Sequence, residues 1–455
     1  MVGLLLVSAV WNIPAAADSI AASGVPTVLS LEQAIEIALS ESPSVKIADN
    51  EVLAKQYAKK GTYASLFPEI SASGSFNRTL KKQVMTMDFG GVSQSIEVGR
   101  WNTVNGGVSA SMPLVNAQLW KSLSISGQDV ELAVEKARSS RLEMVNQVKQ
   151  AYFGVLLAKE AHHVYESVYQ NAVQNMELTQ KKYNASKASE LDLARAKTTV
   201  ANAVPNMYDS ENAIFLALWQ LKAVMGVDLG ADIEVKDSLL VYSSAMAPSV
   251  FKADYDLSGN STMRQLEMQA RQLADNIKIQ QYANLPSLAL AGSYTFNAME
   301  NEFNFSEYDW HPYSYVALSL SIPIFAGGKR HNNIRQARIQ ADELAIQRQN
   351  TERQLQIAIR QSLSTMETAV KSHESAMDAL ESAKKAYDIA AKSYEIGRST
   401  LTDLDAAQLA LTQAQLSASQ AIYNFLVAKA SLESTIGADY AAPAATPSSS
   451  ENTIK

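Results

Sequence analysis

The chain has 455 residues, of which 39 are Lys or Arg and 46 are Asp or Glu, so its formal net charge is −7. This charge argues against a protein that binds nucleic acid through bulk positive charge. Apolar residues make up 47% of the chain and charged residues 19%, which excludes disorder as the dominant state. The chain has no cysteine, which excludes disulfides, thiolate metal sites, cysteine nucleophiles and a cysteine lipid anchor.

The first residues carry an export pattern. A short apolar run at residues 2–10, followed by the small residues of PAAAD at 14–18, predicts a signal peptide over residues 1–17. No run of about 18 apolar residues follows, so a membrane crossing would have to be made by strands. The segment 438–455, rich in Ala, Pro, Ser and Thr, is predicted to be disordered.

The chain is internally duplicated. The sequence YNASKASELDL at 183–193 recurs as YEIGRSTLTDL at 394–404, an offset of 394 − 183 = 211 residues. Such a repeat indicates two copies of one structural unit. We therefore expect a first repeat at 29–226, a linker at 227–250 and a second repeat at 251–437.

Each repeat opens with a helix and a pair of strands. Helical patterns at 31–65 and 263–284 run into prolines, after which apolar and small polar residues alternate with period two. Two returning strands end at a further proline, where a helix is expected to begin. Polar segments at 81–100 and 298–311 are predicted to be outward-facing loops. The four predicted junctions between strands and helices are Pro68, Pro113, Pro286 and Pro323.

Two helical hairpins follow the strand pairs. No Gly or Pro occurs between Gly328 and Gly397, which predicts a helix about 100 Å long, with a counterpart at 118–183. Shorter helices are expected to return over 189–225 and 400–436, the first of them kinked by Pro205. Heptad spacing of apolar residues predicts coiled-coil packing. The returning seams are Leu193, Val200, Met207, Ile214 and Leu221, then Leu404, Leu411, Ala418, Phe425 and Leu432.

The four predicted strands have the length and the side-chain pattern of strands that cross a membrane. Each is about 11 residues long with one apolar face and one Ser, Asn or Thr face, which is typical of strands that cross a bilayer. Four strands cannot close a barrel, since the smallest have about eight, so several copies must share one. The alternative is a pair of soluble β-hairpins packed on helices. The long helices favour strands that cross a membrane. The predicted fold class is therefore an α+β membrane protein with a helical coiled-coil barrel and four transmembrane strands in each chain.

This arrangement resembles the TolC-like outer-membrane factor family over about residues 29–437. The resemblance rests on the motif Tyr-x-x-small-x-x-Ser/Thr-x-x-Asp-Leu-x-x-Ala at 183–196 and again at 394–407, and on IPIFAGGKR at 322–330. It implies a homotrimer with a shared 12-strand β-barrel in the outer membrane of a Gram-negative bacterium and a helical tunnel crossing the periplasm. The resemblance also implies that residues 227–250 form part of an equatorial belt around the tunnel. The partners it implies are a periplasmic adaptor, an inner-membrane pump that the adaptor joins to the tunnel, and outer-membrane lipid.

The resemblance also implies functional positions. Residues matching the periplasmic aperture are Asp192, Tyr394, Asp403 and the adjacent Asp405. Residues matching the adaptor-contacting helical tips are Ser186, Lys187, Gly397 and Arg398. Two positions differ from family members that close the aperture with charged residues. Ser399 stands where some members have a basic residue, and Ala406 stands where others have an acidic one, so these two positions cannot form an ion pair.

The expected function is passive exit through an outer-membrane channel-tunnel that serves a tripartite efflux pump or a type I secretion system. We expect no enzyme activity and no cofactor, metal or nucleic acid as ligand. His162 and His163 are adjacent on a helix and point in different directions, which makes them a poor metal site. The sequence Gly327-Gly328-Lys329 lacks the spacing of a phosphate-binding loop. The alternative function is a soluble periplasmic coiled-coil scaffold or adaptor, but the tandem hairpins favour the duct. The cargo would be chosen by the pump rather than by the duct.

Overall fold

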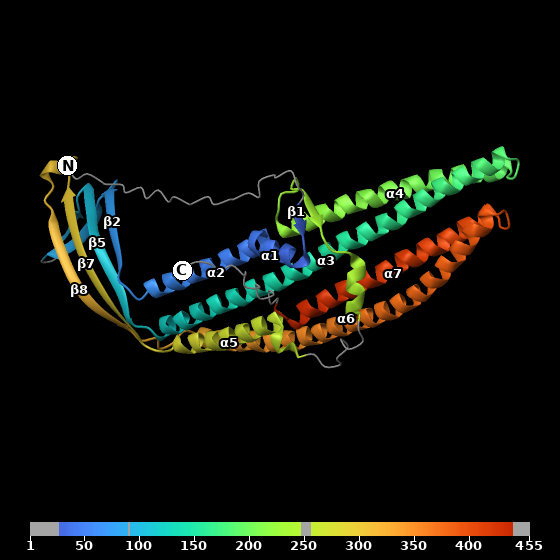
Figure 1. The fold of residues 1–455 in the computed structure, drawn as a ribbon. Helices are drawn as coiled ribbons and strands as arrows, with labels where there is room; N and C mark the ends of the chain where they lie inside the picture. The colour runs from blue at the N-terminus through green and yellow to red at the C-terminus, as the bar shows by residue number, and fades with distance from the viewer. Residues whose placement is uncertain (1–26, 90–91, 247–255, 440–455) are drawn as a thin grey trace, which may run out of the picture. The chain divides into compact units, whose positions relative to one another are not determined.

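The computed structural model describes residues 27–89, 92–246 and 256–439 (Figure 1). The predicted signal peptide at 1–17 lies outside the described residues, as does most of the segment 438–455. The described residues fall into two compact units, each assembled from separate stretches of the chain. One unit takes residues 27–46, 141–246 and 358–439, and the other takes 47–89, 92–140 and 256–357.

The second unit contains an antiparallel four-stranded sheet. Its strands are β2 (Glu69–Arg78), β5 (Asn102–Val115), β7 (Ser287–Glu300) and β8 (His311–Ser321), in the order β2-β5-β7-β8 (Figure 1). All four predicted strands are present. The predicted end of the second strand at Pro113 is wrong, since β5 continues to Val115 through a register shift. A bulge allows a strand to pass a residue that has no N–H to donate.

The register sorts the side chains of the sheet into two faces. Ile70, Ala110, Gly292 and Val316 form one row of partners across the apolar face. On the other face Ser71 Oγ lies 2.9 Å from Ser109 Oγ, and Asn297 donates to Asn105 over 2.6 Å. Each outer strand, β2 and β8, has one strand neighbour in the described chain, so one side of each is an open edge.

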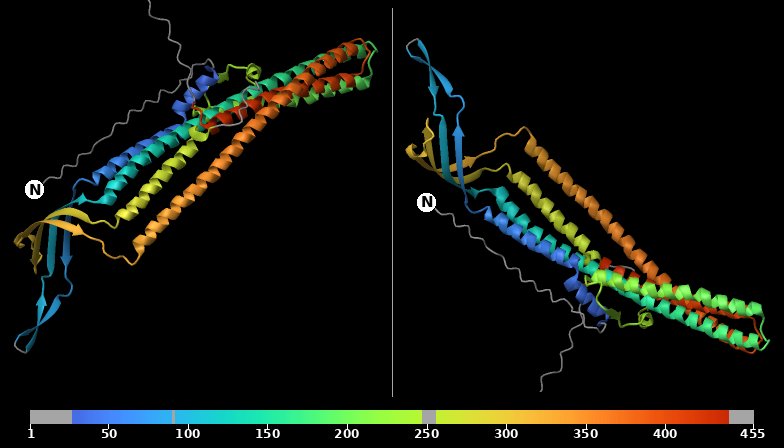
Figure 2. Two further views of the ribbon diagram at one scale, coloured as in Figure 1. Left: turned by 90° about the horizontal axis from the view of Figure 1, so that it is seen from below. Right: turned by 90° about the horizontal axis from the view of Figure 1, so that it is seen from above.

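The predicted loop at 81–100 is in large part a β-ribbon instead. Strands β3 (Gln83–Phe89) and β4 (Val92–Val98) pair antiparallel and extend beyond the four-stranded sheet (Figure 2). The many polar residues of this segment obscured its alternation of apolar and polar side chains. In the ribbon Met85 pairs with Ile96 and Thr86 pairs with Ser95.

The predicted loop at 298–311 is shorter than expected. It holds the 3₁₀ turn η4 (Phe305–Glu307), and two of its aromatic residues pack edge-on against the apolar face of the sheet. Phe303 contacts Phe76 and Trp310 contacts Phe296, each with ring centroids 5.6 Å apart. These side chains form an aromatic border at one end of the sheet.

The predicted helix at 31–65 is two helices. Helix α1 (Leu31–Glu41) is followed by its cap residue Ser42, and α2 (Pro43–Ala64) begins at the proline. Proline has no N–H for a bond to the preceding turn, but it fits the first position of a new helix.

Helix α5 (Ser261–Tyr282) is joined to α3 (Ala117–Asn184) by a buried carboxylate. Asp275 is 7% exposed and accepts bonds from Lys121 over 2.7 Å and from Gln128 over 2.9 Å. Burial opposes the charged form of Asp275, but the hydrogen bonds from Lys121, Gln128 and Lys278 outweigh it and lower the pKa. This ionic contact stays within the second unit.

The long rods confirm the predicted helical hairpins. Helices α3 and α6 (Lys329–Glu395) have 68 and 67 residues, and α4 (Glu190–Met225) and α7 (Leu401–Ile436) return from them. The predicted seam of α7 is buried, with Leu404 and Phe425 at 0% exposure. Helix α4 continues through Pro205. Among the described helices, none combines the length and the apolar character that a membrane span needs.

A small sheet and a 3₁₀ helix hold part of the predicted linker against α3. Strand β1 (Thr27–Leu29) pairs parallel with β6 (Ile233–Val235), and η1 (Leu239–Ala245) follows. The buried Tyr152 hydroxyl donates to Asp237 over 2.7 Å, and Tyr242 donates to the same carboxylate over 2.9 Å. Burial, together with Asp237, raises the pKa of both phenols, so both stay protonated donors at neutral pH.

Candidate functional site at the helical tips

The two turns that join the long helices have the same backbone geometry. Ser186 lies between α3 and α4 with φ 60°, and Gly397 lies between α6 and α7 with φ 77°. The N–H of Ser186 donates to the carbonyl of Tyr183 over 2.9 Å, and that of Gly397 donates to Tyr394 over 3.1 Å. The left-handed region suits glycine, so Ser186 carries a strain that its counterpart avoids.

The predicted aperture aspartates Asp192 and Asp403 are engaged in helix caps. Asp192 accepts from Ser189 N over 3.1 Å and from Ser189 Oγ over 2.7 Å. Asp403 accepts from Thr400 N over 3.0 Å and from Thr400 Oγ1 over 2.7 Å. These bonds lower the pKa of both carboxyls, so both are charged at neutral pH. The repeated motif therefore contains a capping box, which fixes where each returning helix begins.

Tyr394 is held between the two hairpins. It is 5% exposed, and its hydroxyl lies 2.6 Å from Thr179 Oγ1. The Lys182 ammonium lies 3.9 Å from the Tyr394 ring centroid and donates to the Tyr394 carbonyl. Burial lowers the pKa of Lys182, although Glu395 acts in the opposite direction. Sequence reasoning did not single out Thr179 and Lys182, because they precede the repeated motif and are aligned with different residue types, Ala390 and Ser393, in the second copy.

Asp405 lies apart from Asp403, in a small cavity between the hairpins. Its carboxylate accepts from Thr199 of α4 over 3.4 Å. Burial raises its pKa, and the bond from Thr199 opposes that effect only in part. The other side chains of the cavity are uncharged, and they are Val168, Ala172, Asn175, Ala196, Leu401 and Gln408.

The raised pKa of Asp405 predicts a pH-dependent stability. A carboxyl whose folded pKa exceeds its unfolded pKa stabilises the fold below the unfolded value, and this stabilisation is lost as the pH rises through the folded value. Asp405→Asn, which is neutral at every pH, should therefore raise the thermal midpoint at about pH 7.5 and change it little at about pH 4. Thermal unfolding followed by circular dichroism measures this. Asp378→Asn, at an exposed position on α6, is the control, and an equal shift in both variants would contradict the expectation.

The predicted adaptor-contacting residues lie exposed at the turns. Besides Ser186 and Gly397, these are Lys187 and Arg398. The backbone N–H of Lys187 donates to the Lys182 carbonyl over 2.8 Å, and that of Arg398 donates to Ser393 over 2.7 Å. Each turn is closed by hydrogen bonds of its own backbone and leaves these side chains exposed.

The junction prolines take three different positions. Pro68 and Pro286 directly precede β2 and β7, and Pro113 lies inside β5. Pro323 follows β8 by two residues, but α6 begins only at Lys329, so the expected helix start at this proline is wrong. The intervening turn has left-handed backbone at two glycines, which delays the helix.

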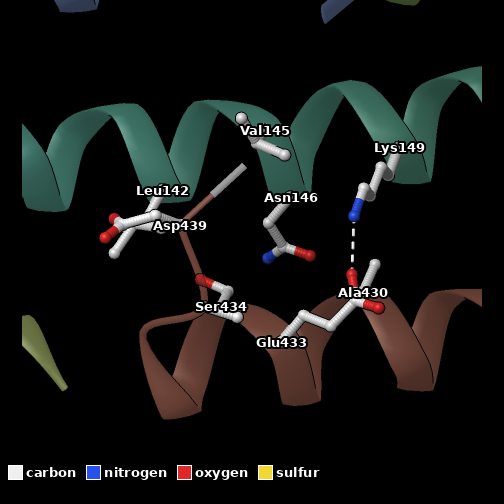
Figure 3. A pocket seen from close by; sticks show the side chains of 9 residues that line it. Leu142, Val145, Asn146, Lys149, Ala430, Glu433, Ser434 and Asp439 are labelled. Carbon is white, nitrogen blue, oxygen red and sulfur yellow. Dashed lines mark hydrogen bonds and ion pairs between the residues drawn. The ribbon is translucent and has the colours of Figure 1, made fainter. Parts of the chain in front are cut away.

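A cleft of about 260 Å³ lies between α3 and α7 (Figure 3). Lys149 and Glu433 face each other across it and form an ion pair of 2.6 Å. The charges of Lys149 and Glu433 thus neutralise each other within the cleft. No group of three or more His, Asp or Glu side chains in the described chain could hold a metal ion.

Comparison with known proteins gives the family. The model of the family described as outer membrane efflux protein matches residues 34–227 and 256–438. The chain belongs to this family. It is a family of efflux proteins rather than of enzymes, and the predicted resemblance and outer-membrane location are confirmed.

Individual relatives are distant. The solvent efflux pump outer membrane protein SrpC of Pseudomonas putida is 24% identical over 318 residues, which cover 69% of this chain and 65% of SrpC. The outer membrane protein TolC of Escherichia coli (strain K12) is 20% identical over 357 residues, covering 74% of this chain and 70% of TolC. The alignment with SrpC thus spans just under two thirds of that relative.

A solved structure shows the same fold. The Campylobacter jejuni CmeC outer membrane channel aligns with a TM-score of 0.70 at 18% identity, covering 90% of this chain and 85% of CmeC. The predicted combination of four long strands and long helical hairpins in each chain is therefore confirmed.

Proposed function

We propose that this protein is a passive exit duct across the outer membrane, formed by three copies that share a 12-strand barrel. The observation that carries the proposal is the four-stranded sheet, which has one apolar face, one polar face and two open edges in the described chain. Open edges in lipid leave backbone groups without partners, so neighbouring copies must pair β8 with β2. The apolar face would then contact lipid and the polar face would line the pore.

The long helices would continue the duct into the periplasm. At about 1.5 Å per residue, α3 and α6 each reach roughly 100 Å, and the exposed turns at Ser186 and Gly397 would contact a periplasmic adaptor joined to an inner-membrane pump. Asp192 and Asp403, in the capped first turns of α4 and α7, would narrow the pore at this end, whereas Tyr394 and Asp405 lie between the hairpins. A ring of acidic groups there favours cations.

The family supports a channel over the soluble scaffold, and no catalytic role is proposed. SrpC is named as a solvent efflux component. We infer that this chain also serves efflux or secretion, with the cargo selected by the pump.

Fractionation and complementation test the proposal. The full chain should accumulate in outer membranes as a detergent-requiring, heat-modifiable trimer, and deletion of its gene should sensitise cells to dyes, bile salts or solvents. A soluble monomer, or a deletion strain without any transport defect, would overturn the duct.

Single-channel recording tests the aperture residues separately. Asp403→Asn keeps an acceptor for the Thr400 cap but removes the charge, so it should lower cation selectivity without unfolding the tip. Glu374→Gln, at an exposed position on α6, is the control, and equal selectivity in the two variants would place Asp403 away from the pore.

A further inference from the structure

Helices α2, α3, α5 and α6 join the four-stranded sheet at one of its ends (Figure 1). Glu69 of β2, Ser111 of β5 and Ala291 of β7 lie in one row across the sheet. Ser287, at the start of β7, pairs with Ser321 at the end of β8. Helix α2 leads into β2 at this end, and α6 follows β8 there. In the proposed duct this is the periplasmic end of the barrel.

Two segments at this end are strongly basic. The segment 52–68 contains three lysines and no acidic residue, and the segment 329–341, which opens α6, contains four Lys or Arg and no acidic residue. The whole chain has a formal net charge of −7, so these two segments depart from its average composition. We refer to their cations as the basic collar, which comprises Lys55, Lys59, Lys60, Lys329, Arg330, Arg335 and Arg338.

The cations of the basic collar form no ion pair within the part of the chain that the structure describes. Other lysines near the sheet do, since Lys121 lies 2.7 Å and Lys278 lies 3.4 Å from the carboxylate of Asp275. Arg330 donates to a neutral group instead, the carbonyl of Pro323, over 3.1 Å. The positive charge of the collar is therefore not balanced by carboxylates of the same chain.

A groove of about 590 Å³ lies at the α2 part of the collar, and Lys59 and Lys60 both line it. The Lys60 ammonium lies 4.9 Å from the Tyr57 ring centroid. A methyl group added at Gly127 of α3 would lie 3.9 Å from Lys59 Nζ, so Lys59 extends over α3. The remaining lining is mostly apolar and consists of Gln56, Tyr63, Ala64, Phe67 and Val130.

The groove has a charged end and an aromatic end. Tyr63 and Phe67, which are 45% and 68% exposed, follow the two lysines along the chain and therefore lie nearer to β2. The connection from β8 to α6 adds Phe325, which is 86% exposed. Aromatic side chains next to cations are typical of the boundary between a bilayer and water. A glycerophospholipid has the same polarity, with its acyl chains toward the bilayer and its phosphate toward water.

Assembly of the duct would bring the two basic segments together. Pairing of β8 with β2 of the next copy places these strands about 4.8 Å apart. The start of α6 in one copy would then lie beside the end of α2 in the next. Like charges at this junction repel each other, and an anion held between them would remove the repulsion.

We propose that the basic collar and the groove bind an anionic glycerophospholipid of the periplasmic leaflet at each junction between copies. Lys59 and Lys60 bind the phosphate, and Tyr63 and Phe67 contact an acyl chain. The α6 cations of the next copy face the same headgroup, so the lipid stabilises the trimer. This inference rests on the proposed trimeric duct.

Lipid retention by the purified trimer tests the site. In native mass spectrometry the detergent-solubilised trimer, mixed with phosphatidylglycerol, should retain this lipid. Lys59→Gln with Lys60→Gln should weaken the apparent affinity by about tenfold or more, because each basic group near an anionic lipid surface adds to the attraction. The control is Lys371→Gln with Lys385→Gln, which removes the same charge from two α6 side chains that are each 71% exposed. Equal phosphatidylglycerol binding by the two double variants would overturn the proposal.

Two further comparisons separate a lipid from a free anion. Phe67→Ser keeps both lysines but removes part of the aromatic end, so it should also lower phosphatidylglycerol binding. Glycerol 3-phosphate carries a phosphate without acyl chains and should not compete. Competition by glycerol 3-phosphate, or unchanged lipid binding by Phe67→Ser, would show a site for a free anion and would overturn the assignment to lipid.

Heat stability of the trimer tests the position at the junction. Phosphatidylglycerol in place of phosphatidylcholine should raise the temperature at which the unmodified trimer dissociates on denaturing gels. Arg335→Gln with Arg338→Gln on α6 should abolish this rise, as should the double variant of Lys59 and Lys60. A rise that persists in the α6 variant would overturn the placement between copies. A chain that forms no trimer in outer membranes overturns the duct itself, whereas a trimer that does not respond to phosphatidylglycerol overturns only this inference.

Discussion

Val316→Arg in the centre of β8 should keep the protein from accumulating as a stable trimer in the outer membrane. Val316 is 80% exposed in the single chain and lies on the apolar face, opposite Gly292 of β7. On the proposed lipid-facing side near the bilayer centre, an arginine costs about 2–4 kcal/mol in each chain. The amount of heat-modifiable trimer in isolated outer membranes measures the effect.

A matched control lies at the same depth on the other face. Ser293 follows Gly292 and pairs with Tyr315, so its side chain points to the polar face of the sheet. Ser293→Arg should assemble normally and should change only the conductance or ion selectivity. If the two variants assemble equally well, the assignment of the apolar face to lipid is wrong.

Phe425→Ala should cause the largest loss of stability in the helical part of the protein. Phe425 is 0% exposed and lies in the heptad seam of α7. Truncating a buried phenylalanine removes its burial and leaves a cavity, which together cost about 3–5 kcal/mol. Denaturant unfolding of the detergent-solubilised protein, followed by helical circular dichroism, measures the change in the free energy of unfolding.

Gln420→Ala supplies the comparison on the same helix. Gln420 is exposed, and its amide donates to Asn424 one turn further along over 2.9 Å. A surface contact of this kind contributes a few tenths of a kcal/mol, so the midpoint should barely change. A similar loss in both variants would mean that Phe425 does not pack in the core of the seam.

Local features of the chain could be predicted because they depend on neighbours in sequence. The strands followed from alternation, as in Ile70 to Asn77, and the long helices from the absence of Gly and Pro before Gly397. The α7 seam followed from heptad spacing, and the turn before each returning helix followed from the repeated motif. Each of these patterns has a period or a residue type with a direct steric cause.

The errors arose where a local pattern competed with another preference. The ribbon β3–β4 was hidden by polar side chains, although its backbone pairs continuously from Gln83 to Phe89. Strand β5 continued through Pro113 because a bulge absorbs one residue that has no N–H. Helix α1 ended before Pro43 because the proline begins a new helix there.

The sequence by itself determined the duplication, the strands, the rods and the positions of the two turns, because these depend on spacing along the chain and on the conformations that each residue allows. Only the tertiary structure decided the partners of Tyr394, since Thr179 and Lys182 lie more than 200 residues away. It also decided that Asp403 belongs to a cap while Asp405 faces a cavity. Side chains two residues apart on a helix point in different directions, and which side of the helix is buried depends on the helices packed against it.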